Sequence, residues 1–278
     1  MKTLDAILTA ECKLSEGREA EIFDWGEARV LRLYRSATAD REARYQVDLL
    51  RQIAGLGLRV PLVHEVATVM GRPGVVMERL DGPDLLTDLA RRPWRVLQVG
   101  AICGRLHARL NDAPAPSIVP SLLDLLHRRI TQSEIVPERY ARLALDFLSR
   151  LPDGGQLCHG DFHPGNVMVS GGEPVVIDWS IASRGSPEAD FAQSQLLLSL
   201  GEPPPGAPPH LKALALVGRS LLLGAYRRAY RRSRQVNEEA LRRWHLPLAV
   251  ARLAAGIREE GTRLTRRVDR LIASGVER

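Results

Sequence analysis

His159-Gly160-Asp161-Phe162-His163-Pro164-Gly165-Asn166 is the stretch of this sequence that decides its fold. Asp178 follows twelve residues after Asn166, at the end of the apolar run Val175-Val176-Ile177, which is typical of a buried strand. The Pro-Gly pair keeps the stretch a loop, because proline lacks an N–H and glycine tolerates positive φ. The loop can therefore return Asn166 towards Asp161, and the strand end brings a third oxygen-bearing side chain to the same small volume.

These residue types suit phosphoryl transfer. Moving a γ-phosphoryl group from ATP needs one or two Mg²⁺ ions, which are hard cations that prefer oxygen ligands. The amide oxygen of Asn166 and the carboxylate of Asp178 would supply such ligands. Asp161 would instead face the acceptor, where it would take a hydroxyl proton or orient the nucleophile. The spacing therefore predicts a kinase site that uses ATP and Mg²⁺.

The stretch resembles the catalytic loop of the aminoglycoside phosphotransferase and choline kinase-like family, whose pattern is His-Gly-Asp-x-x-x-x-Asn. Ile177-Asp178-Trp179 resembles the family's Ile-Asp-Trp motif, which takes the place of the protein-kinase Asp-Phe-Gly. Two motifs in this order are a stronger signal than a lone glycine-rich loop. The resemblance implies that Asp161 is the catalytic base and that Asn166 and Asp178 bind Mg²⁺.

The resemblance also implies the fold, which is an α+β, two-lobed protein-kinase-like fold. A small N-terminal lobe would contain an antiparallel sheet and one helix, and a larger, mainly helical lobe would follow. We expect residues 1–78 to form the nucleotide-binding lobe, residues 79–82 the hinge, and residues 83–278 the helical lobe with the catalytic loop and the acceptor site.

Hydrophobic periodicity gives the elements expected inside this frame. Strands are predicted at residues 4–13, 20–25, 29–35, 60–70 and 74–77, with a helix at residues 39–53. Further helices are predicted at residues 97–110, 122–131, 138–151, 211–231, 238–254 and 257–273. The proline-rich residues 201–209 should form a stiff linker between helices.

Arg32 stands where the family usually carries a lysine that contacts the α- and β-phosphates of ATP. Arginine has a wider, planar group than lysine, and it can bind phosphate bidentately. We therefore expect Arg32 to contact phosphate, and a solvated strand residue is the alternative. Glu42 is the candidate partner of Arg32, as in kinases, although a glutamate favoured by the helix dipole would look the same. Gly17 and Arg18 lie where a kinase-like fold has its glycine-rich loop, and an ordinary hairpin turn is the alternative there.

Four further residues receive roles from the resemblance. The backbone of Glu78 and Leu80 would bind the edge of adenine, and His163 would either contact phosphate or shape the loop. Asp190 falls in a segment that resembles the family's Gly-x-Pro-x-x-Asp-Leu-Ala, where the aspartate bonds to the catalytic-loop backbone. We therefore expect Asp190 to have a structural role.

The chain has 278 residues, of which 45% are hydrophobic, and a formal net charge of +6. That length is enough for one large or two modest domains with their own cores. Asp5 interrupts the only early apolar run, so we expect no signal peptide. The richest apolar stretch, residues 211–226, contains two basic residues and is not expected to span a membrane. The expected location is cytoplasmic.

The spacing of the cysteines and the distribution of charge argue against a cysteine metal site and against a nucleic-acid-binding protein. Cys12, Cys103 and Cys158 lack metal-ligand spacing and are expected to be buried, reduced thiols, with Cys158 packed in a core rather than acting as a nucleophile. The positive charge comes from arginines spread over many predicted helices, and no aromatic stacking platform is interleaved with them. We therefore do not expect specific nucleic-acid binding to be the main function.

Three functions remain, and the first is preferred. It is a small-molecule kinase that phosphorylates a hydroxyl group. The second is a non-catalytic nucleotide-binding scaffold, which Arg32 motivates. The third is a basic nucleic-acid-associated protein. Aminoglycosides are polycations and would need an acidic cleft, whereas arginines outnumber acidic residues after Pro187. A neutral sugar, nucleoside, macrolide-like compound or other alcohol is an equal candidate for the acceptor. The sequence leaves open the oligomeric state, the preference for ATP or GTP and the pathway.

Overall fold

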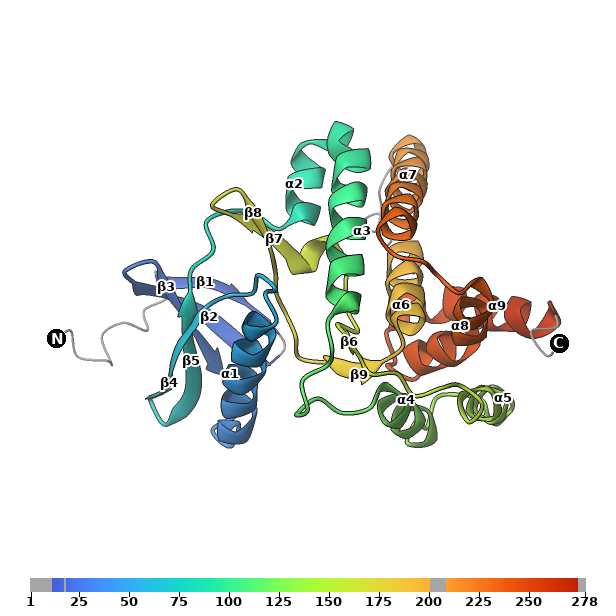
Figure 1. Cartoon of the computed structure of the whole chain (residues 1–278), viewed down its shortest axis with the longest axis horizontal. Helices are drawn as coiled ribbons and strands as arrows, with labels where there is room; N and C mark the ends of the chain where they lie inside the picture. Colours follow the sequence, from blue (N-terminus) through green and yellow to red (C-terminus); the bar gives the residue numbers. More distant parts are fainter. Residues whose placement is uncertain (1–11, 18, 201–208, 275–278) are drawn as a thin grey trace. The chain divides into compact units, whose positions relative to one another are not determined.

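A computed structural model describes residues 12–17, 19–200 and 209–274 of the chain (Figure 1). The chain forms two compact units. The first consists of Met1–Asp84 with Val167–Ser180, and the second of Leu85–Asn166 with Ile181–Arg278. Arg18, most of the strand expected at residues 4–13 and all but the last residue of the linker expected at residues 201–209 lie outside the described residues.

An antiparallel sheet of five strands, in the order β1-β2-β3-β5-β4, forms the body of the first unit. Its strands are β1 (Lys13–Glu16), β2 (Ala20–Gly26), β3 (Arg29–Tyr34), β4 (Val63–Val69) and β5 (Arg72–Glu78). In the register of β3 against β5, Val30 lies opposite Met77 and Arg32 opposite Val75. The antiparallel sheet expected for the N-terminal lobe is therefore confirmed.

Helix α1 (Asp40–Gly55) packs on one face of this sheet (Figure 1). Its buried residues Ala43, Val47 and Leu50 recur at intervals of three or four, which places them on one side of the helix. Ala43 and Val47 join Val30 and Tyr34 of β3 in one hydrophobic cluster. The alternation along β3 therefore sets which of its side chains face the helix.

A short hairpin from the middle of the chain also belongs to the first unit. It consists of β7 (Val167–Ser170) and β8 (Glu173–Val176). The N–H of Val176 donates to the carbonyl of Arg59 at 3.1 Å, and the N–H of Asp81 donates to Ser170 Oγ at 3.3 Å. Residues 83–278 were all expected in the helical lobe, whereas this hairpin belongs to the first unit. The hinge expected at residues 79–82 stays a prediction.

The second unit is mainly helical (Figure 1). Its helices are α2 (Leu85–Arg91), η3 (Pro93–Arg95), α3 (Val96–Asp112), α4 (Leu122–Thr131), α5 (Glu138–Leu148), η4 (Pro164–Asn166), α6 (Pro187–Leu200), α7 (Pro209–Ser233), α8 (Glu238–Leu253) and α9 (Arg258–Ala273). Two short strands, β6 (Gln156–Cys158) and β9 (Ser183–Gly185), pair antiparallel beside them. Within the described part of the chain, no helix is both long and apolar enough to cross a membrane.

Sequence periodicity did not predict α6. Most of this helix is buried, including polar residues such as Asp190, Ser194 and Gln195 as well as Phe191 and Leu196. A helix that is enclosed on most sides has no exposed polar face, so its sequence lacks the amphipathic stripe that marks a surface helix. Hydrophobic periodicity in the sequence therefore gives no sign of this helix.

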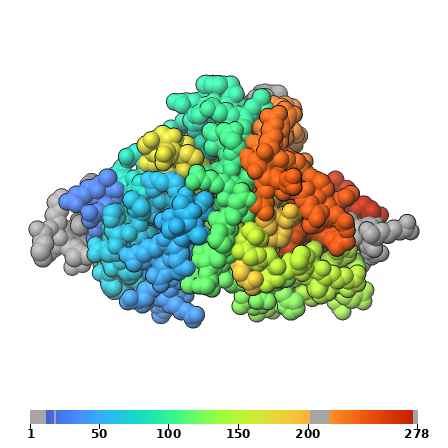
Figure 2. Space-filling model, viewed as in Figure 1, coloured from blue at the N-terminus to red at the C-terminus, as the bar shows by residue number. Residues whose placement is uncertain are grey.

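Helices α3 and α7 pack closely and side by side, as the green and orange surfaces in Figure 2 show. A Cβ atom added to Gly100 would come within 2.7 Å of the Leu222 carbonyl oxygen. The same addition at Gly104 would clash with the backbone of Tyr226. Glycines therefore allow the two helix backbones to approach at successive turns.

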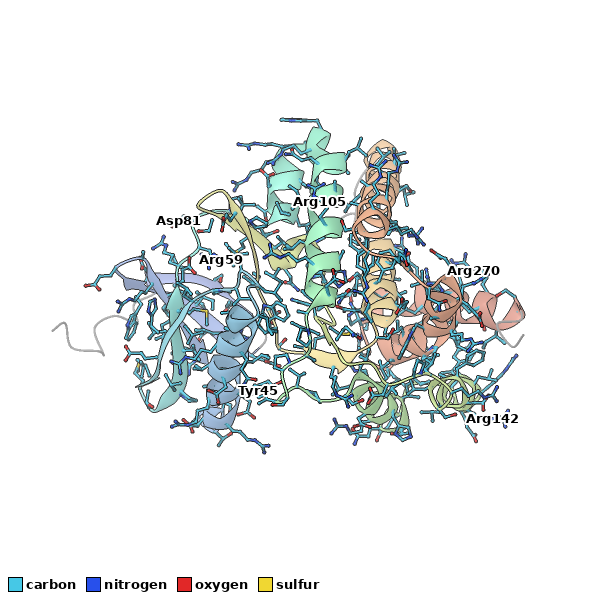
Figure 3. All side chains as sticks on the ribbon, in the orientation of Figure 1. Tyr45, Arg59, Asp81, Arg105, Arg142 and Arg270 are labelled. Carbon is cyan, nitrogen blue, oxygen red and sulfur yellow. The ribbon has the colours of Figure 1, made fainter. Side chains whose placement is uncertain are left out.

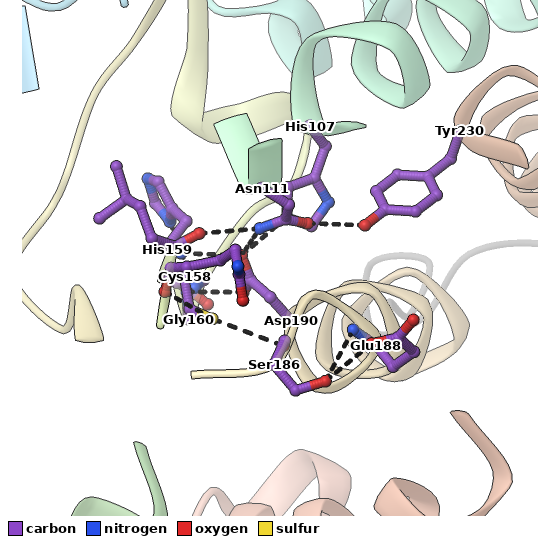
Figure 4. Close-up of polar contacts among 12 residues, drawn as sticks. His107, Asn111, Cys158, His159, Gly160, Ser186, Glu188, Asp190 and Tyr230 are labelled. Atoms are coloured by element: carbon purple, nitrogen blue, oxygen red, sulfur yellow. Dashed lines mark hydrogen bonds and ion pairs between the residues drawn. The ribbon is translucent and has the colours of Figure 1, made fainter. Parts of the chain in front are cut away.

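The buried carboxylate of Asp190 joins several elements of the second unit (Figure 4). Its Oδ2 accepts from the His159 N–H at 2.8 Å and lies 2.8 Å from His107 Nε2, and its Oδ1 accepts from the Gly160 N–H at 2.9 Å. Asn111 Nδ2 donates to Oδ2 at 3.0 Å. These bonds confirm the structural role expected for Asp190.

The other nitrogen of His107 lies 2.7 Å from the Tyr226 hydroxyl, so the imidazole bridges α3, α6 and α7. The His107 ring also stacks on Phe162 of the catalytic loop, with ring centroids 4.2 Å apart. Burial alone would raise the pKa of Asp190. His107, Asn111 and the Gly160 N–H outweigh that effect, and the pKa lies well below its usual range. The carboxylate is therefore ionised at neutral pH.

Replacing Asp190 by alanine should lower the free energy of unfolding by about 3–5 kcal/mol, because buried donors and His107 lose their shared partner. Urea denaturation at pH 7 measures this loss. Asp146→Ala removes an exposed carboxylate from α5 and should cost less than about 1 kcal/mol.

The loss should also depend on pH. A depressed folded-state pKa stabilises the fold above the ordinary carboxyl pKa of about 4, and this stabilisation fades as the pH falls below it. The difference between wild type and Asp190→Asn should therefore shrink at acidic pH. A difference that stays constant or grows on acidification would contradict this role.

Candidate active site

The catalytic loop closes on itself as its spacing predicted. Strand β6 leads into it, and Asn166 Nδ2 donates to the Asp161 carbonyl at 2.9 Å and to Asp161 Oδ2 at 3.3 Å. The Asn166 N–H donates to the His163 carbonyl at 2.9 Å. Both side-chain bonds use the amide nitrogen, so they leave the amide oxygen of Asn166 free to bind a cation.

Histidine side chains fix the shape of the loop. His163 Nδ1 accepts from the Gly165 N–H at 3.0 Å, and His159 Nδ1 accepts from the Asp161 N–H at 3.2 Å. Gly160 has φ of +81°, in the left-handed region that favours glycine. Of the two roles considered for His163, these contacts support the shaping of the loop.

Asp161 is an ionised carboxylate at neutral pH. Burial opposes its ionisation, but His163, His159 and Arg252 together outweigh burial and lower its pKa. The distance from His163 Nε2 to Asp161 Oδ2 is 3.7 Å. A carboxylate with a lowered pKa is a weak base, so it is better suited to accept a hydrogen bond from an acceptor hydroxyl and orient it.

Sequence reasoning missed two arginines near this carboxylate. Arg129 lies on α4 and Arg252 on α8, and the charge of each interacts with that of Asp161. Arg252 is held by Glu260 through two hydrogen bonds of 2.7 Å. Arg129 has no ion-pair partner among the residues that the structure describes. No local motif signals either residue, because only the packing of α4 and α8 brings them close.

A cavity of about 30 Å³ lies beside the loop and is lined by residues that include Arg129, Gly160 and Gln193. This volume is enough for one water molecule or one small polar group. In the described structure, the buried Oε1 of Gln193 has no hydrogen-bond partner. The cavity is therefore a small recess with a mainly apolar lining, next to the residue that precedes Asp161, and Arg129 and Gln193 are among its polar lining residues.

The first unit contains the other predicted site residues. Arg32 lies on the face of β3 that α1 covers, and its guanidinium carbon is 5.6 Å from the centre of the Tyr34 ring. Glu42 is exposed on α1. In the described ranges, no ion pair joins Arg32 and Glu42, contrary to the pairing expected from kinases. Arg32 instead lies over an aromatic ring, which is a favourable position for a guanidinium.

Arg32, Glu42 and Asp178 all lie near the hydroxyl group of Tyr34. Burial raises the pKa of this tyrosine, Arg32 lowers it, and the negative charges of Glu42 and Asp178 raise it further. Arg32, Glu42 and Asp178 therefore lie close enough to influence one largely buried hydroxyl. Tyr34 itself was not predicted as a site residue, because it matched no motif.

Asp178 has an unusual backbone conformation. Its φ is +59°, in the left-handed region that few residues other than glycine adopt. The next residue, Trp179, is fully buried, and its Nε1 donates to the Val176 carbonyl at 3.0 Å. The buried indole therefore anchors the turn, and the Asp178 side chain remains exposed. Such conformations often occur at functional sites.

The remaining predicted contacts are backbone groups. The Glu78 N–H donates to the Leu62 carbonyl at 2.8 Å, and its carboxylate pairs with Arg59, so only its carbonyl could serve adenine. The described residues provide no hydrogen-bond acceptor for the Leu80 N–H. The Gly17 N–H donates to the Ala20 carbonyl at 2.8 Å, which closes a hairpin turn and leaves this N–H unavailable to phosphate.

Comparisons with known proteins identify the family and the fold of this chain. The sequence profile of the phosphotransferase enzyme family, APH, matches residues 13–235. A comparison with curated proteins gives no significant match. Among solved structures, a thermostable mutant of aminoglycoside phosphotransferase APH(4)-Ia is similar, with a TM-score of 0.65 and 20% identity over 96% of this chain and 94% of that one. A further variant of that mutant was solved in a ternary complex with ADP and hygromycin B.

Two other kinases are also similar in structure. Amicoumacin kinase hAmiN, in complex with AMP-PNP, Ca²⁺ and Ami, has a TM-score of 0.62 and 14% identity over 96% of this chain and 90% of that one. A choline/ethanolamine kinase family protein from Mesorhizobium loti has a TM-score of 0.58 and 14% identity over 93% and 84%. The profile match covers most of the chain, and these structures share its fold. The chain therefore belongs to the phosphotransferase enzyme family, and it is a small-molecule phosphotransferase with a protein-kinase-like fold.

Proposed function

We propose that this protein transfers the γ-phosphoryl group of ATP, with Mg²⁺, to a hydroxyl group of a small molecule. The observation that carries the proposal is the closed loop in which Asn166 holds the ionised carboxylate of Asp161 at 3.3 Å. This loop stands on the buried Asp190, so its carboxylate is positioned before any substrate binds. Positioning of this kind is the main protein contribution to phosphoryl transfer.

Asp161 would accept a hydrogen bond from the acceptor hydroxyl and orient its oxygen towards the γ-phosphorus. Asn166 and Asp178 would hold Mg²⁺, which neutralises the charge of the phosphates when it is bound. Two observations support their fit to this cation. The Asn166 amide oxygen is left free by the loop, and the Asp178 carboxylate is exposed at an anchored turn.

ATP would contact the first unit. Arg32 would bind the α- and β-phosphates, since its charge is permanent and no acidic side chain in the described chain pairs with it. The Leu80 N–H and the Glu78 carbonyl would meet the edge of adenine. The ADP and AMP-PNP complexes of the similar kinases support nucleotide binding by this fold.

The acceptor would be a neutral or anionic alcohol. Arg129 and Arg252 both place positive charge near Asp161, and Glu260 already neutralises Arg252. A polycation would be repelled by the unpaired charge of Arg129. Hygromycin B, which a similar enzyme binds together with ADP, is therefore not proposed as an acceptor for this chain.

A second candidate is a nucleotide-binding protein without turnover. The absence of an Arg32–Glu42 ion pair in the described chain and the engaged Gly17 N–H favour it, because both contacts would assist phosphate binding. A scaffold of this kind would bind ATP with no stimulation of ADP release by any acceptor. The kinase is preferred because a scaffold needs none of Asp161, Asn166 and Asp178.

Asp161→Asn should lower acceptor-stimulated ADP release by about 10²–10⁴-fold, because the amide cannot accept the hydroxyl hydrogen bond as a carboxylate does. The affinity for ATP, measured by calorimetry, should change by less than about threefold, since this residue faces the acceptor. The exposed Asp146→Asn on α5 serves as the control and should retain full activity. An Asp161→Asn enzyme with more than a tenth of wild-type turnover would overturn the assignment.

An acceptor panel tests the proposed substrate class. Neutral sugars, nucleosides and hydroxy acids should include substrates with kcat/KM above about 10⁴ M⁻¹s⁻¹, whereas aminoglycosides should fall below that value. Arg129→Gln should improve the residual rate with aminoglycosides, because it removes a repelling charge. Arg142→Gln removes an exposed arginine from α5 and should leave the ranking unchanged. Efficient phosphorylation of aminoglycosides by the wild type would contradict the proposed class.

A further inference from the structure

A second cavity lies entirely within the helical unit, between α3 and α7, and its volume is about 380 Å³. The residues that line it are Leu97, Ala101, Arg105, Ser220, Leu221, Gly224, Ala225, Arg228, Ala229, Arg232 and Ser233. We call it the α3–α7 groove. Its volume is in the usual range of small-molecule sites, roughly 300–1,000 Å³. None of its lining residues belongs to the candidate active site.

Three arginines line the groove without a counter-charge. Arg105 comes from α3, and Arg228 and Arg232 come from α7. Figure 3 labels Arg105 on α3. None of the residues that line the groove is acidic, and across the described ranges these three arginines form no ion pair. Arg228 and Arg232 are four residues apart on one helix, where like charges repel. Binding of an anion would relieve that repulsion.

The groove has an apolar end and a basic end. Gly100 of α3 faces Leu222 and Tyr226, and Gly104 faces Tyr226 and Tyr230, so the two helices run in the same direction. The early residues Leu97 and Leu221 therefore share one end of the groove. Arg105, Arg228 and Arg232 share the other end.

The apolar end is also open to water. Leu97 is 56% exposed and Leu221 is 44% exposed. A ligand that covers these two leucines would remove their apolar surface from water. An occupant with a carboxylate or phosphate head and an apolar tail would satisfy both ends.

We propose that the α3–α7 groove binds a small amphipathic organic anion, with its acidic head between Arg105, Arg228 and Arg232 and its apolar tail along Leu97 and Leu221. Guanidinium groups bind carboxylate or phosphate through paired hydrogen bonds. The tail loses its contact with water against the leucines, which adds affinity that inorganic phosphate cannot gain. The site is separate from phosphoryl transfer and does not depend on the proposed function.

Gly224 gives a sharp test of this site. It lines the groove, and a Cβ atom added to it would meet nothing within 4 Å. Gly224→Leu should therefore fold and fill the groove while leaving every charge in place. Gly218 lies on the same helix, also has open space, and does not line the groove. Gly218→Leu is the matched control.

The experiment measures binding of octyl phosphate, below its micelle concentration, to the full chain by calorimetry. The wild type should bind it at least about tenfold more tightly than inorganic phosphate, because only octyl phosphate reaches the apolar end. Gly224→Leu and the double variant Arg228→Gln/Arg232→Gln should each weaken binding at least about tenfold. Gly218→Leu and the exposed Arg142→Gln on α5, which Figure 3 also labels, should leave it unchanged.

Several results would overturn the proposal. One is undetectable binding of octyl phosphate by the wild type, and another is equal affinity for octyl phosphate and inorganic phosphate. Equal loss in Arg142→Gln and in the double variant would show attraction by overall charge. Full binding by a folded Gly224→Leu protein would place the ligand elsewhere. Circular dichroism of each variant distinguishes loss of the site from loss of the fold.

Discussion

The buried carboxylate of Asp190 links the packing of the helices in the second unit to the shape of the catalytic loop. Asp190 sits on a helix enclosed by its neighbours, yet it is charged, and that charge is tolerable only because donors surround it. Two of those donors are the N–H groups of His159 and Gly160, at the start of the catalytic loop. The packing of the helical core and the shape of the loop are therefore parts of one constraint. The loop cannot shift without leaving a buried charge unsatisfied.

The arginines of the second unit differ in whether an acidic side chain pairs with them. The arginines that are scattered along the sequence occupy distinct positions in the fold, some held by acidic partners and some without any in the described ranges. Arg252 is neutralised by Glu260, whereas Arg129 near Asp161 and the three arginines of the α3–α7 groove form no ion pair with any described residue. Net charge alone predicts none of this, because a pairing partner decides whether an arginine is a structural or a binding residue. The proposed class of acceptor near Arg129 and the proposed anion site in the α3–α7 groove both depend on arginines that lack such a partner.

Much of the fold was predictable from the sequence, for particular reasons. The catalytic loop and Ile177-Asp178-Trp179 are local motifs, and their spacing alone predicted a loop that returns Asn166 to Asp161. Amphipathic helices such as α4 and α9 were visible because one face is polar. Helix α6 was not visible, since it is buried on most sides.

Long-range packing explains what the sequence could not show at the site. The segment Val167–Ser180, which contains the β7–β8 hairpin, belongs to the first unit although it follows the catalytic loop directly. Arg129 and Arg252 approach Asp161 only through the packing of two helices. The candidate ion pair between Arg32 and Glu42 does not form among the described residues, where Arg32 lies over Tyr34 instead, an arrangement that no motif encodes.

Electron paramagnetic resonance of Mn²⁺ in the presence of ADP tests the proposal that Asn166 and Asp178 both bind a metal–nucleotide complex. Wild type should bind Mn²⁺–ADP, and Asn166→Ala and Asp178→Ala should each weaken binding at least about tenfold. Unchanged Mn²⁺–ADP binding by both folded variants would contradict the proposed role of Asn166 and Asp178.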